Sequence, residues 1–492
     1  MTAPCRPRWL ALALTATLSA CAGSPGGADK GDATDGGPDG TAADAGPDGD
    51  AADGGPDGDA ADTGPLDFGP QTPWDKPDGW TGPDRILAPE CWLLPFLPEP
   101  GEIDREFQYA GDFTMAADVD RVYVITGGSV PNARTRAEPT NFFLHAVDAD
   151  GVELWRTGIY GAEAPVAILV ADAGDVIVVF NDRRLEFGWG GFVDKVSRDG
   201  DILWYSSAPG LAGVPQATGG IRGAPALDED GNVYVNYGTV VSSLSGLDGS
   251  PRWSRAMPDD ACDASVWVDL VVVGDVVWAV SACGVFAWAR DGTERVALPR
   301  TEWARPAPGK AAVLTSGELV IGRGGALERL TASGEVADHW DGLDASEGSD
   351  LLVAPDDTLV VVRSGSASVM AGGRVLWTEG LRGDGRDPII DDRGQLVTGA
   401  VDLRTLPDGE LTGPYDRGRR SLPSTGVVLR AGQLIAPTYL YPVGAPEDGH
   451  AIAALQCVAL PVGLPAPNSW SRRHGDQQNR RRWSPAGGAG AP

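Results

Sequence analysis

From about residue 85 onward, the chain consists of short β-branched and aliphatic runs separated by Gly, Asp and Pro. No long stretch shows the 3.6-residue periodicity of an amphipathic helix. Short apolar runs that are bounded by turn-forming residues indicate β-strands. The pattern therefore predicts an all-β fold.

One hairpin pattern recurs along this region. Its eight copies are residues 116–125, 170–180, 226–235, 270–280, 313–322, 352–362, 389–399 and 427–437. Their turns lie near Asp120, Gly174, Gly231, Gly274, Gly317, Asp356, Gly394 and Gly432, at intervals of about 38 to 57 residues. This spacing is typical of propeller blades and predicts a β-propeller of eight blades.

A second element follows most of the hairpins, in which a strand enters an Asp/Gly turn and the return strand carries a tryptophan. The tryptophans are Trp155, Trp204, Trp253 and Trp377, with Trp340 in a looser copy. We expect each large ring to pack between neighbouring blades, where its burial stabilises the fold by at most about 3 kcal/mol. The fourth and seventh copies keep the turn but lose the tryptophan, so seven blades remain an alternative.

The acidic stretch "VDADGVELW" (147–155) allows two interpretations, a calcium loop or a hairpin turn. A calcium loop needs several oxygen ligands, including a late carboxylate. A turn needs only Asp or Gly for its backbone angles. Asp148 and Asp150 are not repeated consistently in the other copies, whereas the glycine equivalent to Gly151 is. This favours the turn, and no metal ligands are predicted.

The strand pair with "DG-x-VYV" and the following "LD-x-x-G-x-x-x-W" resemble the repeat of pyrroloquinoline-quinone-like (PQQ-like) β-propellers, over roughly residues 105–483. The segment 468–483 is similar to one at the edge of such propellers, with Trp470, Asp476 and Arg482 at the matching positions. The resemblance implies that this segment helps to close the ring, although its five arginines would also suit an anion-binding patch. The predicted propeller spans 85–483, with a disordered tail at 484–492.

The N-terminus has the features of a signal peptide at residues 1–20. Arg6 and Arg8 precede an apolar stretch of 12 residues, which is too short to span a bilayer. The sequence Leu18-Ser19-Ala20-Cys21 resembles the lipobox of bacterial lipoproteins, which implies lipidation of Cys21. Two or more acyl chains anchor a protein stably. Ala22 follows the cysteine, and by the family's sorting pattern this favours the outer membrane.

Residues 21–84 are expected to form a disordered linker rich in Asp, Gly, Pro and Ala. A nine-residue motif repeats in tandem over 37–63, and residues 22–68 contain twelve Asp and one basic residue. Such a segment buries no apolar surface, and its like charges extend it. We interpret it as an acidic tether in front of the propeller.

The chain as a whole has a formal net charge of -30, which makes nucleic acid an unfavourable partner. The PQQ-like resemblance raises a quinoprotein oxidoreductase as the alternative function, but the sequence has no adjacent cysteines and no C-x-x-C-H haem motif. No catalytic or cofactor-binding residue is predicted, and no cofactor. The four histidines, His145, His339, His450 and His474, show no metal-ligand spacing and are expected to be surface or hydrogen-bonded residues.

The sequence therefore predicts a monomeric, lipid-anchored β-propeller outside the cytoplasm that acts as a non-catalytic binding or scaffold module for protein partners. In general plan it resembles lipoprotein propellers such as BamB. Those propellers have little linker before the fold, whereas this chain has a long one.

Four cysteines remain after the signal peptide and the lipidated Cys21, an even number in an oxidising compartment, and three pairings are open. Cys262 and Cys283 flank one predicted hairpin and are predicted to pair. Cys91 begins the folded region and Cys457 lies in the last blade. Because a closed ring brings its ends together, we predict a Cys91–Cys457 disulfide.

Overall fold

A computed structural model describes most of the predicted propeller. The described residues are 86–97, 105–106, 115–128, 140–161, 165–182, 190–207, 221, 223–257, 267–299, 308–323, 325–343, 345, 349–363, 365–381, 388–398, 402–416, 426–428, 430–440, 452–466 and 482–483. The chain divides into two units, 1–63 and 64–492, and all of the described residues lie in the second. The predicted signal peptide, the linker and the C-terminal tail fall outside the described residues.

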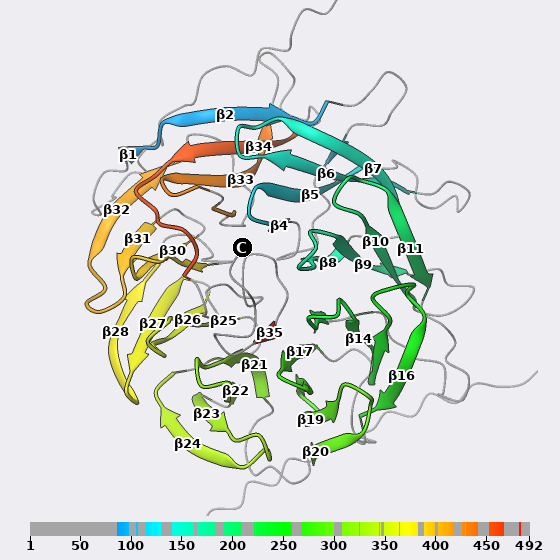
Figure 1. The fold of residues 1–492 in the computed structure, drawn as a ribbon. Coiled ribbons are helices and arrows are strands. Elements are labelled where there is room, and N and C mark those ends of the chain that lie inside the picture. The colour runs from blue at the N-terminus through cyan, green and yellow to red at the C-terminus, as the bar shows by residue number, and fades with distance from the viewer. Residues whose placement is uncertain are drawn as a thin grey trace, which may run out of the picture. The chain divides into compact units, whose positions relative to one another are not determined.

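Eight sheets follow one another around a ring (Figure 1), which confirms the prediction of an eight-bladed β-propeller. The strands nearest the centre are β4 (Met115–Ala117), β8 (Pro165–Val170), β13 (Ala226–Leu227), β17 (Val268–Val273), β21 (Pro308–Val313), β25 (Asp350–Val353) and β29 (Ile389–Ile390). In the eighth blade this inner position is taken by Val427, which forms a bridge with Ile435. The weak fourth and seventh copies are therefore true blades.

The next strands outward pair antiparallel with these inner strands. They are β5 (Arg121–Gly128), β9 (Val176–Asp182), β14 (Val233–Tyr237), β18 (Val276–Ser281), β22 (Leu319–Arg323), β26 (Leu359–Arg363), β30 (Gln395–Val397) and β33 (Gln433–Leu440). The third strands are β6 (Thr140–Asp148), β10 (Gly190–Val196), β15 (Val240–Leu244), β19 (Gly284–Ala289), β23 (Ala326–Leu330), β27 (Ser366–Ala371), β31 (Asp402–Thr405) and β34 (Ile452–Ala459). The inner two strands of each blade form the hairpin that the repeat predicted.

The outermost strands lie at the rim of the ring (Figure 1). They are β7 (Glu153–Gly161), β11 (Ile202–Ser207), β16 (Pro251–Ala256), β20 (Glu294–Pro299), β24 (Val336–Asp341), β28 (Arg374–Gly380), β32 (Leu411–Asp416) and, in the eighth blade, β2 (Glu90–Pro95). All eight carry one register shift of the β-bulge type opposite the third strand. The described part of the chain contains no helix that is long and apolar enough to cross a membrane.

The ring is closed by its N-terminal strand. β33 and β34 come from the end of the propeller, and β2 comes from its beginning and pairs antiparallel with β34. The C-terminal segment was expected to take part in closure, but its described part, β35 (Arg482–Trp483), pairs in parallel with β17 of the fourth blade. β12 (Gly223–Ala224) also pairs in parallel with β17, and β3 (Arg105–Glu106) pairs with β5.

Apolar side chains fill the interfaces between neighbouring blades. Val176 to Phe180 of β9 are all fully buried, because a strand in the middle of a blade has a neighbouring blade on each face. One apolar layer packs the eighth blade against the first and contains Phe96, Val124 and Leu455. The closing interface is therefore an apolar layer like the internal ones, and Trp92 and Leu94 of β2 pack against it.

Candidate functional site

The tryptophans of the outer strands contact the next blade of the ring. In four blades, the first, second, third and sixth, the indole Nε1 donates to a carbonyl oxygen in the turn between the third and fourth strands of the next blade. These bonds join Trp155 to Arg198 (2.8 Å), Trp204 to Gly246 (3.2 Å), Trp253 to Arg290 (2.8 Å) and Trp377 to Leu406 (2.6 Å). Each indole thus covers the face of its neighbour's turn. Trp470 lies outside the described residues.

A glycine of the same turn lies against each indole ring. At Gly200 an added Cβ would lie 2.9 Å from the Trp155 ring, and at Gly249 it would lie 2.6 Å from the Trp204 ring. Both glycines have positive φ, which other residues adopt at a cost. Two physical reasons therefore explain why glycine recurs at this turn position: the backbone needs a positive φ, and the indole ring leaves no space for a Cβ. Trp340 lies more loosely, with its Nε1 3.1 Å from that position at Gly373.

Trp92 in β2 occupies the same position in the closing blade, which the repeat comparison missed. Its Nε1 donates to the Ala149 carbonyl (3.0 Å), and its ring lies against Gly151 of the first blade. The signal was present in the sequence, because "PECWLLPF" carries a tryptophan inside an apolar run. It was not recognised because the strand is separated from the rest of its blade by the whole propeller.

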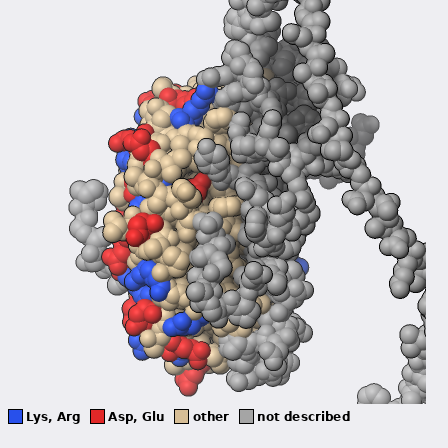
Figure 2. Space-filling view, turned by 90° about the vertical axis from the view of Figure 1, so that its right-hand side faces the viewer, with Lys and Arg blue, Asp and Glu red and all other residues tan. Residues whose placement is uncertain are grey.

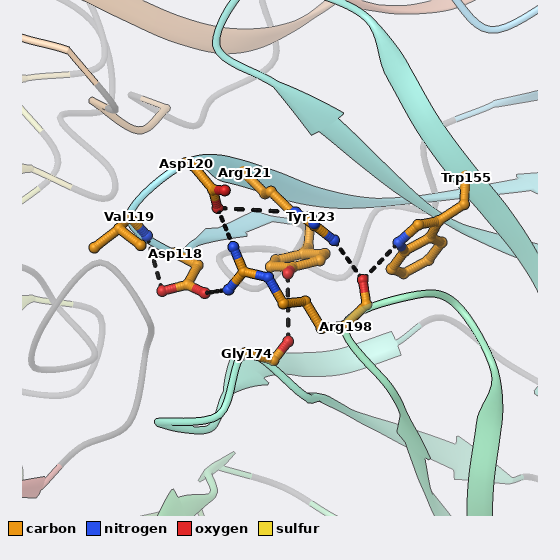
Figure 3. Close-up of polar contacts among 8 residues, drawn as sticks. All are labelled: Asp118, Val119, Asp120, Arg121, Tyr123, Trp155, Gly174 and Arg198. Carbon is orange, nitrogen blue, oxygen red and sulfur yellow. Dashed lines mark hydrogen bonds and ion pairs between the residues drawn. The ribbon is translucent and has the colours of Figure 1, made fainter.

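Arginine clamps add polar contacts between blades on the face that carries the hairpin turns (Figure 3). The Arg198 guanidinium of the second blade donates to Asp118 (2.7 Å) and to Asp120 (2.6 Å) of the first blade. The Arg198 carbonyl accepts from both Trp155 and Arg121. Because Asp118 is almost fully buried, the guanidinium stabilises a carboxylate that would otherwise be costly there.

Tyr123 lies beneath this clamp and donates its hydroxyl to the Gly174 carbonyl (3.3 Å). Burial, and secondarily the Asp118 carboxylate, raises the pKa of Tyr123 to about 12. The hydroxyl therefore stays neutral at physiological pH and acts as a hydrogen-bond donor. Its position indicates a structural rather than a catalytic role.

The clamp recurs elsewhere on the same face. Arg290 of the fourth blade pairs with Glu229 of the third, and Arg198 and Arg290 share the sequence Arg-Asp-Gly. Arg430 of the eighth blade pairs with Asp150 of the first (2.5 Å). Such surface ion pairs contribute little individually, but together with the tryptophans they fix neighbouring turns relative to one another.

The stretch "VDADGVELW" forms a hairpin turn. The Asp148 carboxylate accepts from the backbone N–H groups of Asp150 and Val152, both at 2.9 Å. The side chain of Asp150 is held by Arg430, whose hydrogen bond is the main cause that lowers the Asp150 pKa. Both carboxylates therefore have a structural use in this turn. Among the described residues no group of three or more His, Cys, Asp or Glu side chains is arranged to hold a metal ion.

His145 has the one arrangement in the described part of the chain that resembles a catalytic triad. Its Nε2 lies 2.8 Å from Thr126 Oγ1, and its Nδ1 lies 2.7 Å from Glu153 Oε1. Thr126 and His145 are both fully buried, so a substrate has no access to the hydroxyl. The network therefore satisfies buried polar groups inside the first blade.

His339 lies at the surface of the fifth blade between Glu328 (3.3 Å) and Asp341 (3.0 Å). This hydrogen-bonded placement is what the sequence led us to expect. His450 and His474 lie outside the described residues.

The outer strand β11 differs from the other rim strands. Within its bounds it reads "ILWYSS", without a charged residue or proline, whereas every other outermost strand of the described blades contains at least one. Ile202, Leu203 and Tyr205 are exposed by 43%, 49% and 77%. Natural sheet edges are usually protected from further pairing by charge, proline or a covering segment. Among the strands that the structure describes, β10 is the one partner of β11.

The space-filling view of this side of the ring shows where charge is placed (Figure 2). Lys, Arg, Asp and Glu side chains gather along the margin at the left of the view, and most of the described surface beside them is uncharged. A surface of this kind suits contact with another polypeptide better than contact with a polyanion.

The cysteines that were predicted to form disulfides lie in two parts of the propeller. Cys283 is disulfide-bonded, but its predicted partner Cys262 lies outside the described residues, as does Cys21. Cys91 and Cys457 are both free thiols, so the predicted covalent bond between them is not formed in this structure. They do lie next to each other, on the paired strands β2 and β34.

Comparison with known proteins supports the fold. Residues 113–337, just under half of the chain, match the family model "Outer membrane protein assembly factor BamB". This confirms the resemblance to PQQ-like propeller repeats over that range. No curated protein matches the chain.

Several solved structures are also similar. BamB from Moraxella catarrhalis is 15% identical with a TM-score of 0.39, and the match covers 62% of this chain and 97% of that one. A quinohemoprotein alcohol dehydrogenase from Comamonas testosteroni is 10% identical with a TM-score of 0.44, with coverages of 76% and 78%. A structure described as streptogramin B lyase is 11% identical with a TM-score of 0.40, with coverages of 62% and 93%. Similarities this low do not carry a function to this chain.

Proposed function

We propose that this protein is a lipid-anchored binding module of the cell envelope, and that it holds an extended segment of a partner protein at the β11 edge of its second blade. The observation that carries this proposal is the unprotected β11 strand. Its exposed apolar side chains, and an outer backbone edge that pairs with no other described strand, are complementary to an added strand.

The same ring supports strand addition as the mode of contact. The outer edge of the seventh blade is already extended by β1 (Ile86–Leu87), which pairs in parallel with β32 through Tyr415 and Asp416. A rim strand of this propeller can therefore pair with an additional extended segment. β11 is likewise the outermost strand of its own blade, and its side chains are more apolar.

The clamps and tryptophans on either side of the second blade also favour this role. Arg198 joins it to the first blade, and Trp204 joins it to the turn of the third. Because β11 is held on both sides, it is preorganised for a partner and loses little conformational freedom on binding. A lipid on Cys21 would anchor the chain, and the predicted linker would then keep this edge near the outer membrane.

Photocrosslinking tests the proposal. A photoreactive amino acid is placed at Tyr205, and for comparison at Leu376, an apolar residue of another rim strand, β28, that is 46% exposed. In intact cells we expect a defined crosslink from position 205 to one extended segment of another envelope protein, and little from position 376. Leu203→Lys should abolish that product, while Leu376→Lys in the 205-labelled protein should leave it unchanged.

Three outcomes would contradict the proposal. Crosslinks from position 205 to peptides of the same chain would show self-association instead. Equal products from positions 205 and 376 would show non-specific contact. The absence of any product from position 205 in intact cells would show that the β11 edge is unoccupied.

A further inference from the structure

The closing blade contains two cysteines that come from opposite ends of the propeller. Cys91 lies in β2 and Cys457 in β34, 366 positions apart along the sequence. Glu90 pairs with Val458 and Trp92 with Cys457, so Cys91 is the additional residue of a β-bulge. A bulge redirects the side chain of its additional residue. Here the Cys91 side chain lies within hydrogen-bonding reach of the Cys457 thiol.

The equivalent bulge residues in other blades show why Cys91 is accessible. Leu154, Leu203 and Leu376 each precede the tryptophan of an outer strand, and all three are exposed. Cys91 precedes Trp92 and is exposed in the same way. The bulge position thus presents one thiol to solvent at the seam of the ring.

Cys457 has the opposite environment. It is fully buried in the apolar layer between the eighth and first blades. Burial raises the pKa of the Cys457 thiol well above its usual value, and its hydrogen bond with Cys91 raises it further. Cys457 therefore stays protonated and is not the thiol that an external reagent reaches first.

We propose that Cys91 and Cys457 form a redox-controlled clasp across the closing seam, and that exposed Cys91 is the thiol through which an external disulfide makes and breaks it. This goes beyond the binding function proposed above and does not depend on it. The co-reactant is a disulfide, either a small-molecule disulfide or the active-site disulfide of an oxidoreductase.

Closure takes place by two exchange steps. The Cys91 thiolate, after loss of its proton to solvent, attacks the external disulfide, forms a mixed disulfide and releases one thiolate. The Cys457 sulfur, as its proton leaves, then attacks the Cys91 sulfur and displaces the second thiolate. Two electrons pass from the cysteine pair to the external disulfide, which leaves as two thiols. Reduction reverses both steps and again begins at the exposed sulfur.

The bond would tie the N-terminal strand to the last blade. β2 supplies Trp92 to the seam between the eighth and first blades, and Phe96, the residue that follows β2, also packs there, so release of this segment would open the ring there. A cross-link between residues so distant in sequence restricts the unfolded chain strongly. Oxidation is thus expected to stabilise the closed ring, and reduction to return it to the non-covalent closure seen in this structure.

Equilibration with glutathione tests the clasp on the full mature chain in detergent. Free thiols are blocked after incubation with oxidised or reduced glutathione, and the protein is mapped without reduction. We expect a Cys91–Cys457 peptide after oxidation and two alkylated thiols after reduction. The thermal midpoint should be higher by about 5 °C or more in the oxidised form. Two alkylated thiols after oxidation, or a link from Cys91 to Cys283, would overturn the proposal.

Two variants test the order of attack. Cys457→Ala keeps the core position apolar and should trap one glutathione on Cys91. Cys91→Ser should give no glutathione adduct on Cys457, because no accessible thiol begins the exchange. An adduct on Cys457 in the Cys91→Ser protein would show that the buried thiol reacts by itself and would exclude the assigned role of Cys91. Intact Cys283 pairing in each map serves as the control for native folding.

Discussion

Trp92→Ala is expected to lower the free energy of unfolding by about 3 kcal/mol, the lower end of the cost of a tryptophan-to-alanine change in a packed site. The substitution removes the hydrogen bond to the Ala149 carbonyl and the ring that lies against Gly151. Both contacts join β2 to the first blade. The loss should appear as a lower urea midpoint when unfolding is followed by circular dichroism.

Trp80→Ala provides the matched control, because Trp80 lies in the predicted linker 21–84. It should change the free energy of unfolding by less than about 0.5 kcal/mol. A similar effect of the two substitutions would show that β2 is not required to hold the ring closed.

Cys21→Ser is expected to move the protein from the membrane fraction to the soluble fraction of the cell envelope. The substitution removes the thiol that would receive the lipid, and stable anchoring needs at least two acyl chains. Fractionation with detection of the propeller, together with labelling by a radioactive fatty acid, measures the change. Persistence of a processed, membrane-bound and labelled Cys21→Ser protein would refute the lipoprotein assignment. Cys5→Ser, which lies within the predicted signal peptide, should leave localisation unchanged.

The blade architecture could be predicted from sequence because each blade repeats the same local rules. The inner hairpins are continuous apolar runs around a turn, and Gly174 and Gly231 supply the positive φ that such turns need. Even the sixth turn, which has no glycine, follows the pattern. Asp357 adopts φ 64° there, and its carboxylate accepts from both the backbone N–H and the hydroxyl of Thr315 in the fifth blade.

Contacts between distant segments were harder to predict. A strand that pairs with a partner more than 360 residues away, as β2 does with β34, has no local signal of its register. The bulge that turns Cys91 toward Cys457 is likewise a property of the pair rather than of either strand. The same reason explains why the C-terminal segment was expected at the ring closure and its described part instead lies at β17.

The candidate binding edge was also missed at the level of sequence. "ILWYSS" appears as an ordinary apolar strand until its place at the rim is known, because the same residues in a central strand would be buried. Its significance depends on comparison with the other outermost strands, which the fold makes possible. The arginine clamps have a partial sequence signal in Arg198-Asp199-Gly200 and Arg290-Asp291-Gly292, but their acidic partners lie on other blades.

Titration of the purified mature chain with pyrroloquinoline quinone and calcium tests most directly whether this propeller is a binding module or an oxidoreductase. Cofactor uptake is followed by absorbance after removal of the free quinone, and turnover is followed by dye reduction with a panel of alcohols and sugars. For a binding module we expect no stoichiometric uptake and no dye reduction above that of the quinone alone. Uptake of one quinone per chain with substrate-dependent turnover that is lost on calcium chelation would contradict the proposed function.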